Sequence, residues 1–401
     1  MEPMSEVKYP GLRWVVLVLL WMGIVACFWA QMITAGMAHY LMPALGLTVP
    51  QLTMLVTGVM ITFAVFSLPG GMLGDRIGTR TTLFIGILLA GIGGLLRAYS
   101  ASFVLMFTYT LIMGIGVGFL MANMSKVVAY WFPPKEMHLA LGIAATGIGV
   151  GSSIGLATGA LFASYAAGFL TTGIIALAVA VLWVIVARST RPGVALPPPP
   201  PWGEHLKVAA RSKTIWLLAA VMFFFQAGFM GVSAVMPIGL QVAHGVNPVT
   251  AGLVASVFTI GGFVGNIFGP LIAARTGLVK PNVWVTMIIC GICVYIAWAT
   301  AMSLGTWIFI FIAGLALGVM APAGMVYPVM LPEIGPAFAG VGLGMVTAIG
   351  MVGGFVMPSF VLTPLAAGNF SLMFIFFAIV IVISGLIFLP APEIGPRGRK
   401  E

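Results

Sequence analysis

The sequence predicts an all-α membrane protein with twelve transmembrane helices in two pseudo-symmetric six-helix bundles. Three observations lead to this fold class: 61% of the 401 residues are hydrophobic, only 6% are charged, and the charges fall in short breaks between long apolar stretches. Each stretch has about 20 residues, the length at which an α-helix crosses a bilayer. Soluble globular and disordered classes are excluded, because both need a much larger polar fraction.

Separating the chain at its polar breaks gives the predicted spans in order. The first is expected to be a retained helix and not a signal peptide, because no A-x-A-like cleavage site precedes Met37. The predicted spans cover residues 13–38, 50–70, 80–98, 103–130, 137–162, 168–187, 213–238, 249–274, 281–301, 305–330, 337–364 and 369–389.

The longest polar break divides the chain into two halves. It contains five consecutive prolines, Pro197 to Pro201, which form an extended, semi-rigid spacer. We therefore predict a six-helix bundle over 1–187, a cytoplasmic proline-rich linker over 188–212, and a second six-helix bundle with a short basic tail over 213–401.

The basic residues predict the orientation in the membrane. With both termini in the cytoplasm, every Lys and Arg except Arg97 lies on the cytoplasmic side, 16 of 17 in all. Cytoplasmic loops of membrane proteins carry such an excess of positive charge. The net charge of +9 is therefore interpreted as a topology signal, with contacts to lipid headgroups and none to nucleic acid. The predicted location is the cytoplasmic (inner) membrane, with multiple passes.

Glycines reveal an internal repeat with an offset of about 200 residues. Gly114 and Gly118 in the fourth span match Gly314 and Gly318 in the tenth. Glycines four residues apart share one helix face and allow close helix packing in lipid. A second glycine-rich pair is the fifth span, with Gly147, Gly151, Gly155 and Gly159, and the eleventh, with Gly340, Gly344, Gly350 and Gly354.

The loop after the second span carries a motif, Gly71-Met-Leu-Gly-Asp75-Arg76-Ile-Gly78-Thr-Arg80. It resembles the G-x-L-x-D-R-x-G-x-R signature of the major facilitator superfamily. A weaker echo follows the eighth span, where Ala274 replaces the acid. The resemblance covers the whole chain as a plan of two six-helix halves. It implies secondary transport by alternating access, with a substrate path between the halves.

We expect the motif residues Gly71, Asp75, Arg76, Gly78 and Arg80 to form a gate with the second half. Asp75 would face the positive N-terminus of the eleventh span, near Ala337. Arg76 and Arg80 would pair with Glu136 and Glu333. These contacts are predicted to hold the outward-open state and to break in the inward-open one.

The end of the fourth span suggests the substrate class. Trp131-Phe132-Pro133-Pro134-Lys135-Glu136 looks like the WFP-x-K segment of anion-carrying branches, such as oxalate/formate antiporters, monocarboxylate carriers and nitrate/nitrite porters. The sequence departs from those branches because it lacks a basic residue within the second, eighth or eleventh span. All eight acidic residues also lie outside the predicted membrane core, so no buried carboxylate is available for cation coupling.

Polar and aromatic residues on the helices that line the path in this fold are the candidate substrate-binding set. Lys126 either snorkels to the cytoplasm or faces the floor of the cavity. Arg97, on the external side, either attracts anions to the entrance or anchors its helix. The predicted substrate-binding residues are Trp29, Gln31, Thr34, Asn123, Lys126, Gln226, Ser233 and Tyr327.

The leading functional prediction is translocation of a small anion, with a monocarboxylate as the most favoured substrate. Alternatives are export of neutral or apolar compounds, Cu(I) import along some of the 26 methionines, and a sensor or scaffold that transports nothing. No catalytic constellation, nucleotide loop or metal-spaced His/Cys set occurs, so no enzyme activity, cofactor or metal site is predicted. The chain is expected to be monomeric.

Overall fold

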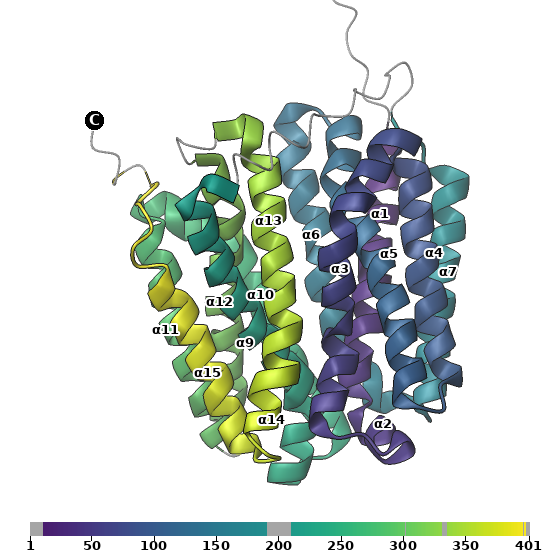
Figure 1. The fold of residues 1–401 in the computed structure, drawn as a ribbon, viewed down its shortest axis with the longest axis vertical. Coiled ribbons are helices and arrows are strands. Elements are labelled where there is room, and N and C mark those ends of the chain that lie inside the picture. Colours follow the sequence, from purple (N-terminus) through teal and green to yellow (C-terminus); the bar gives the residue numbers. More distant parts are fainter. Residues whose placement is uncertain (1–10, 191–209, 301, 331–334, 396, 398–401) are drawn as a thin grey trace, which may run out of the picture.

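The computed structural model describes residues 11–190, 210–300, 302–330, 335–395 and 397. All regular elements in these ranges are helical, and most are long and run side by side (Figure 1). Within the same ranges, eleven helices are long and apolar enough to cross a membrane, and a shorter apolar stretch covers Leu304–Met320. The all-helical membrane fold is confirmed, whereas the number of twelve spans and their orientation stay predictions.

We call the elements α1 to α7 the first bundle, which begins at Leu12. Most predicted boundaries agree within a few residues, but a short helix that was not predicted, Ala38–Leu45, follows the first span. The elements are α1 (Leu12–Gly36), α2 (Ala38–Leu45), α3 (Val49–Ile77), α4 (Thr79–Leu96), η1 (Arg97–Tyr99), α5 (Phe103–Trp131), α6 (Pro134–Thr158), η2 (Gly159–Leu161) and α7 (Tyr165–Val186).

The second bundle contains α9 to α15. Its first helix continues to His244, six residues beyond the predicted end, and the predicted span 337–364 is interrupted by a π-helix. The elements are α9 (Lys213–His244), α10 (Pro248–Thr276), α11 (Lys280–Ala299), α12 (Leu304–Met330), α13 (Gly335–Val356), the π-helix η3 (Met357–Leu362), α14 (Thr363–Leu365) and α15 (Phe370–Ile387).

Equivalent turns precede α3 and α10. Gly46 and Gly245 adopt positive φ angles of 61° and 64° and end the preceding helices. Two residues later Thr48 and Asn247 act as N-caps: the Thr48 hydroxyl accepts from Gln51 N–H, and the Asn247 side chain accepts from the backbone of the equivalent third helical residue. Such caps satisfy backbone donors that the first helical turn leaves free. The repeat therefore extends to local backbone geometry.

Close glycine packing joins α6 to α1, as the sequence predicts. A Cβ on Gly151 would lie 2.5 Å from the carbonyl oxygen of Val25, and one on Gly155 would lie 2.8 Å from the backbone nitrogen of Ile33. Side chains at these positions would force the helices apart, because interiors are close-packed. In the second bundle Gly350 and Gly354 lie against α9 in the same way, whereas a Cβ on Gly344 would have no atom of the described residues within 4 Å.

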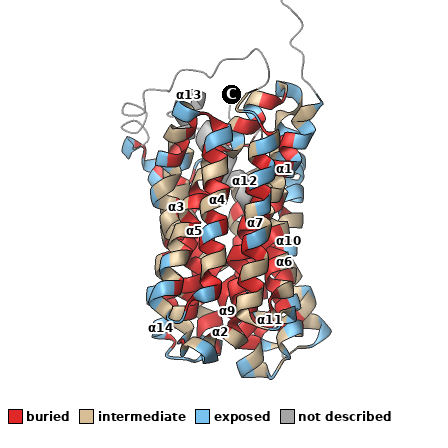
Figure 2. Ribbon diagram, turned by 90° about the vertical axis from the view of Figure 1, so that its right-hand side faces the viewer, coloured by how far each residue is buried: buried red, intermediate tan, exposed pale blue. Residues whose placement is uncertain are grey.

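Burial follows the arrangement of a membrane protein. Buried residues gather inside the bundles, while large apolar side chains such as Val104, Ile185 and Leu304 are 71%, 69% and 76% exposed (Figure 2). Exposed apolar side chains on the outer faces suit contact with lipid tails. We call the end with the α3–α4 and α10–α11 turns the basic end, because Arg76, Arg80 and Arg275 lie there, and the other the opposite end.

Candidate functional site

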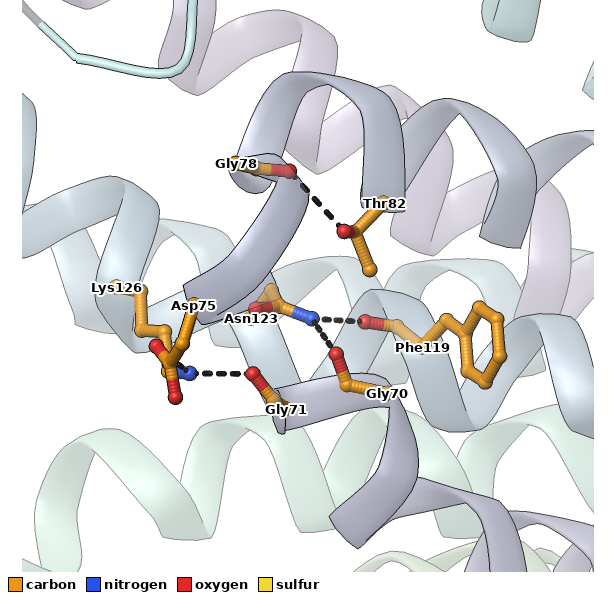
Figure 3. Close-up of polar contacts among 8 residues, drawn as sticks. All are labelled: Gly70, Gly71, Asp75, Gly78, Thr82, Phe119, Asn123 and Lys126. Carbon is orange, nitrogen blue, oxygen red and sulfur yellow. Dashed lines mark hydrogen bonds and ion pairs between the residues drawn. The ribbon is translucent and has the colours of Figure 1, made fainter. Parts of the chain in front are cut away.

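The candidate gating site lies where α3 ends at the basic end. Lys126 Nζ on α5 lies 2.5 Å from Asp75 Oδ1 and donates a 2.7 Å hydrogen bond to the carbonyl oxygen of Gly71 (Figure 3). Both side chains are largely buried, with 21% of Lys126 and 9% of Asp75 exposed. A charged pair in such surroundings is screened little by water, so each partner depends strongly on the other.

Asn123, one turn before Lys126, fixes the same segment of α3. Its Nδ2 donates 2.9 Å hydrogen bonds to the carbonyl oxygens of Gly70 and Phe119. Gly74 allows this approach, because a Cβ there would lie 1.9 Å from Asn123 Oδ1. Lys126 and Asn123 together hold α3 to α5 at the motif.

The structure gives Asp75 a partner that the sequence analysis did not predict. Lys126 neither snorkels freely nor extends alone into the path, because its ammonium group is bound to Asp75 and Gly71. The other carboxylate oxygen of Asp75, Oδ2, is buried and has no hydrogen-bond partner among the described residues. Asp75 therefore keeps an acceptor available for a different partner in another conformation.

Among the described residues, neither Arg76 nor Arg80 pairs with Glu136 in this conformation, whereas their pairing with Glu333 stays a prediction. Glu136 pairs with Arg13 at 3.1 Å, because the start of α1 lies closer to it than the motif does. Arg80 is exposed and donates from Nη2 to the carbonyl oxygen of Val184. Arg76 is exposed, Gly78 is buried and accepts from the Thr82 hydroxyl at 3.0 Å, and Glu333 lies outside the described residues.

The candidate path residues on α1 bond mainly to neighbouring helices. Trp29 Nε1 donates to Thr158 Oγ1 at 3.2 Å, and Gln31 Nε2 donates to the carbonyl oxygen of Val56 at 3.2 Å. Gln31 Oε1 is buried without a hydrogen-bond partner among the described residues. Gln31 thus retains one acceptor that a solute hydroxyl could use.

Arg97 is completely buried, so of its two predicted roles the structure contradicts attraction of anions at the entrance and agrees with anchoring of its helix. Its guanidinium donates to Thr34 Oγ1 at 2.9 Å and to the carbonyl oxygen of Ala30 at 2.5 Å, and lies 4.3 Å from the ring centre of Phe169. These contacts tie α1 and α7 to η1. Arg97 therefore cannot attract ions at an entrance, and Thr34 serves it as an acceptor.

The candidates in the second bundle are dispersed. Gln226 Nε2 lies 3.5 Å from Met351 Sδ, and the buried Ser233 hydroxyl has no partner among the described residues. Tyr327 is buried near the basic end, where its hydroxyl donates to the carbonyl oxygen of Pro392. Tyr327 thus holds the C-terminal segment, and the eight candidates do not form a single cluster.

The sequence analysis missed two groups of polar residues. Glu393 accepts backbone hydrogen bonds from Val279 at 2.8 Å and Lys280 at 3.0 Å, and so caps the N-terminus of α11. Hydroxyl pairs also join the two bundles, Thr57 with Ser359 and Ser153 with Thr259. The repeat offset could have pointed to the hydroxyl pairs, since each pair consists of one Thr and one Ser at related positions.

Comparison with known proteins agrees with this architecture. The family model described as "Major Facilitator Superfamily" matches residues 20–358. Over 149 residues the chain is 30% identical to the hexuronate transporter of Bacillus subtilis, covering 36% of this chain and 35% of that one. It is 24% identical over 149 residues to the D-galactonate transporter of Escherichia coli, covering 37% and 35%. The chain thus spans about a third of the length of these curated relatives.

A solved structure shares the fold over nearly the full length. It is the bacterial homologue of the human lysosomal transporter Spinster in an inward-facing and occupied conformation, with a TM-score of 0.77, 17% identity, and coverage of 98% of this chain and 100% of that one. At this identity the likeness shows the fold alone. The family match over residues 20–358 shows that the chain belongs to the major facilitator superfamily, a family of secondary transporters and not of enzymes.

Proposed function

We propose that this protein moves a small organic anion, with a monocarboxylate first among the candidates, by alternating access. Lys126 is the observation that carries the proposal. Its side chain is one-fifth exposed, and its ammonium group is held by a single carboxylate, that of Asp75, at 2.5 Å. A substrate carboxylate offers Lys126 the same charge-assisted hydrogen bond and can replace Asp75 there. The relatives named for hexuronate and D-galactonate support this class, because each compound carries one carboxylate.

We infer the orientation from the basic residues and place the basic end in the cytoplasm. The conformation of this structure, in which the bundles separate toward the basic end, is then inward-open. Asp75 is bound within its own bundle in this state. Its unpaired Oδ2 would find a donor at the N-terminus of α13 when the basic end closes.

We also propose that no carboxylate in the middle of the membrane couples transport to a cation. Asp75 and Glu136 lie at the basic ends of their helices, and Glu393 lies in the C-terminal segment. Uptake into proteoliposomes should then persist when an ionophore collapses the proton gradient, provided that substrate is supplied as the anion. Complete loss of uptake under that condition would contradict this part of the proposal.

Flux measurements in proteoliposomes test the substrate class. The panel contains lactate, glucuronate, formate, nitrate, a neutral sugar, a lipophilic cation and Cu(I). Saturable uptake restricted to the carboxylates supports the proposal. Transport of the neutral or lipophilic compounds alone supports the alternative of an exporter for uncharged substrates, and transport of Cu(I) alone would overturn the anion assignment.

Substitutions at Lys126 and Asp75 test whether transport of carboxylates needs this charged pair. Lys126→Gln combined with Asp75→Asn removes both charges and leaves no unpaired carboxylate, so the fold is preserved. We expect this double variant to lose carboxylate uptake at least tenfold, while Lys126→Arg retains it in part. Lys135→Ala, an exposed basic residue at the same end, serves as the control and should transport normally.

A further inference from the structure

Two hydroxyl pairs connect the bundles directly. Thr57 Oγ1 on α3 lies 2.9 Å from Ser359 Oγ on η3, and Ser153 Oγ on α6 lies 2.7 Å from Thr259 Oγ1 on α10. All four side chains are buried, with at most 9% of any one exposed. Hydroxyl groups buried in this way exchange hydrogen bonds with each other because water does not reach them.

The pairs are related by the internal repeat. α3 and α10 are equivalent helices and each supplies a threonine, while α6 and the α13–η3 helix are equivalent and each supplies a serine. Thr57 and Thr259 lie 202 residues apart, about one helical turn from the offset of 199 between the N-caps Thr48 and Asn247, and Ser153 and Ser359 lie 206 residues apart. Each pair of residues is therefore close to equivalent positions of the repeat. Each interface between the bundles therefore carries one pair of the same composition.

The pairs lie in the part of the molecule where the bundles touch. On α10 most residues from Ala251 to Gly265 are buried, whereas between residues 266 and 276 Gly269 alone is. On α3 residues 55–60 are all buried, but Val65 and Leu68 nearer the basic end are 58% and 46% exposed. A helix buried all round contacts neighbours on every side, so among the described residues of these helices the contact between the bundles is concentrated away from the basic end.

The same contrast appears on α6. Residues 151–153, 155 and 156 are buried around the helix, whereas nearer the basic end burial falls to about one residue per turn, at Ala140, Ala144 and Gly147. At the opposite end a Cβ on Gly252 of α10 would lie 2.4 Å from the carbonyl oxygen of Leu156. The interface at the opposite end must therefore separate if this end is to open.

The two pairs differ in how many acceptors share their two hydroxyl protons. Thr57 donates its single hydroxyl proton to the carbonyl oxygen of Thr53 at 2.7 Å, so Ser359, which has no other hydrogen bond in the described structure, donates to Thr57. In the other pair Ser153 lies 2.7 Å from the carbonyl oxygen of Gly149, and Thr259 lies 2.9 Å from that of Ser256. Two protons there serve three contacts.

The π-helix places Ser359 for its contact. η3 includes Pro358, which has no backbone N–H and so cannot complete an α-helical hydrogen bond. Single π-helical turns inside α-helices are frequent at functional sites. Ser359 therefore points at Thr57 from an irregular turn, whereas Ser153 and Thr259 lie on regular helices.

We propose that the Thr57–Ser359 and Ser153–Thr259 pairs are the two clasps of the gate at the opposite end, and that they contribute unequally. Opening the gate leaves Ser359 without a protein partner, so the Thr57–Ser359 clasp opposes opening. Ser153 and Thr259 each recover a backbone acceptor when they part, so their clasp opposes opening little. This proposal concerns the gate, goes beyond the proposed transport of anions, and requires no knowledge of the substrate.

Distance measurements between spin labels test the proposal without transport. Val104 on α5 and Leu304 on α12 are both exposed at the end that we call the opposite end. The distance between labels at these two positions reports how far this end is open. We expect Thr57→Val or Ser359→Ala to raise the ratio of open to closed molecules about threefold, the effect of an average interhelical hydrogen bond in a membrane protein. Ser153→Ala and Thr259→Val should change the ratio by less than half of that.

Controls keep the outcome decisive. Thr172→Val removes a buried hydroxyl that bonds only to its own helix and should leave the ratio unchanged. Thr57→Ser retains the hydroxyl and should behave as wild type even if Thr57→Val does not fold. Equal shifts from both clasps would overturn the proton-counting argument, and no shift from Thr57→Val and Ser359→Ala would overturn the gate assignment.

Discussion

The turns that follow α3 and α10 are equivalent in the repeat, yet they hold their acidic residue in different ways. In the first bundle the acid is Asp75, within the helix, and its partner is the Lys126 side chain at 2.5 Å. In the second bundle Ala274 takes the equivalent place within α10, and the acid is Glu393, which follows α15 and binds backbone N–H groups at the start of α11. The two bundles therefore carry their acidic residue at different positions of the repeat.

The segment after α7 completes the comparison. It contains Ser189, whose hydroxyl accepts from Arg80 N–H at 3.3 Å at the start of α4, where the second bundle uses Glu393. A backbone donor is always present, whereas a side-chain donor can be exchanged for another. The contact of Asp75 with a side chain is therefore suited to change between conformations, whereas the contact of Glu393 with the backbone is suited to remain in all of them.

The largest effect should come from Lys126→Ala. It leaves the Asp75 carboxylate buried without its cation, and breaking a buried pair in this way is strongly destabilising. Because Lys126 is one-fifth exposed, we expect a loss of about 2 kcal/mol in unfolding free energy, measured by thermal unfolding in detergent. Adding Asp75→Asn should recover most of the loss, and failure to recover would mean that the pair is not the cause.

Gly74→Ala should have the next largest effect. The added Cβ would lie 1.9 Å from Asn123 Oδ1, so Asn123 must turn away and give up its bonds to α3. Overpacking of this kind costs about 1–2 kcal/mol, measurable in the same unfolding assay. Gly142→Ala is the matched control, because no described atom lies within 4 Å of a Cβ there, and it should be neutral or slightly stabilising.

Glu393→Gln should have a smaller effect of a different kind. The substitution removes a negative charge from the N-terminus of α11, which costs about 0.5–1 kcal/mol. Because Glu393 binds the backbone, the balance between open and closed conformations should not change, whereas Asp75→Asn should change it. A shift in the spin-label distances with Glu393→Gln would show that the second acid also belongs to the gate.

Ser189→Glu should have the smallest effect and sharpens the comparison. It introduces into the first bundle the type of cap that Glu393 provides in the second. A carboxylate at the N-terminus of α4 should increase the free energy of unfolding by about 0.5 kcal/mol. The melting temperature should therefore rise slightly. Ser189→Gln is the uncharged control, and a gain of equal size there would exclude the charge as the cause.

Much of the fold could be predicted from the sequence, because lipid exposure leaves a strong local signal. Long apolar stretches fix the helices, and Thr48 and Asn247 mark their starts as caps. The glycines of α6 predicted a tight helix pair, and Gly151 and Gly155 make it with α1. Each of these properties depends on residues within a few turns of one another, so periodicity and composition are sufficient to detect it.

The contacts between helices were less predictable. Arg97 was expected either to attract anions or to anchor its helix, and only its contacts with Thr34 and Phe169 decide for the anchor. Asp75 was expected to face the second bundle, but in this conformation it binds Lys126. A polar residue in a membrane helix can bond to any helix beside it, so its partner depends on the rotation and depth of both helices.

The sequence by itself determined that this chain is a polytopic helical membrane protein of two related halves, with its motif between the second and third spans. Only the tertiary structure decided which polar groups meet: Lys126 with Asp75, Glu393 with the start of α11, and the hydroxyl pairs between the bundles. The physical reason is the range of the forces. Burial of apolar surface acts on each helix separately and is written in its composition, whereas a hydrogen bond requires two atoms within about 3 Å, and the packing of the whole chain sets that distance.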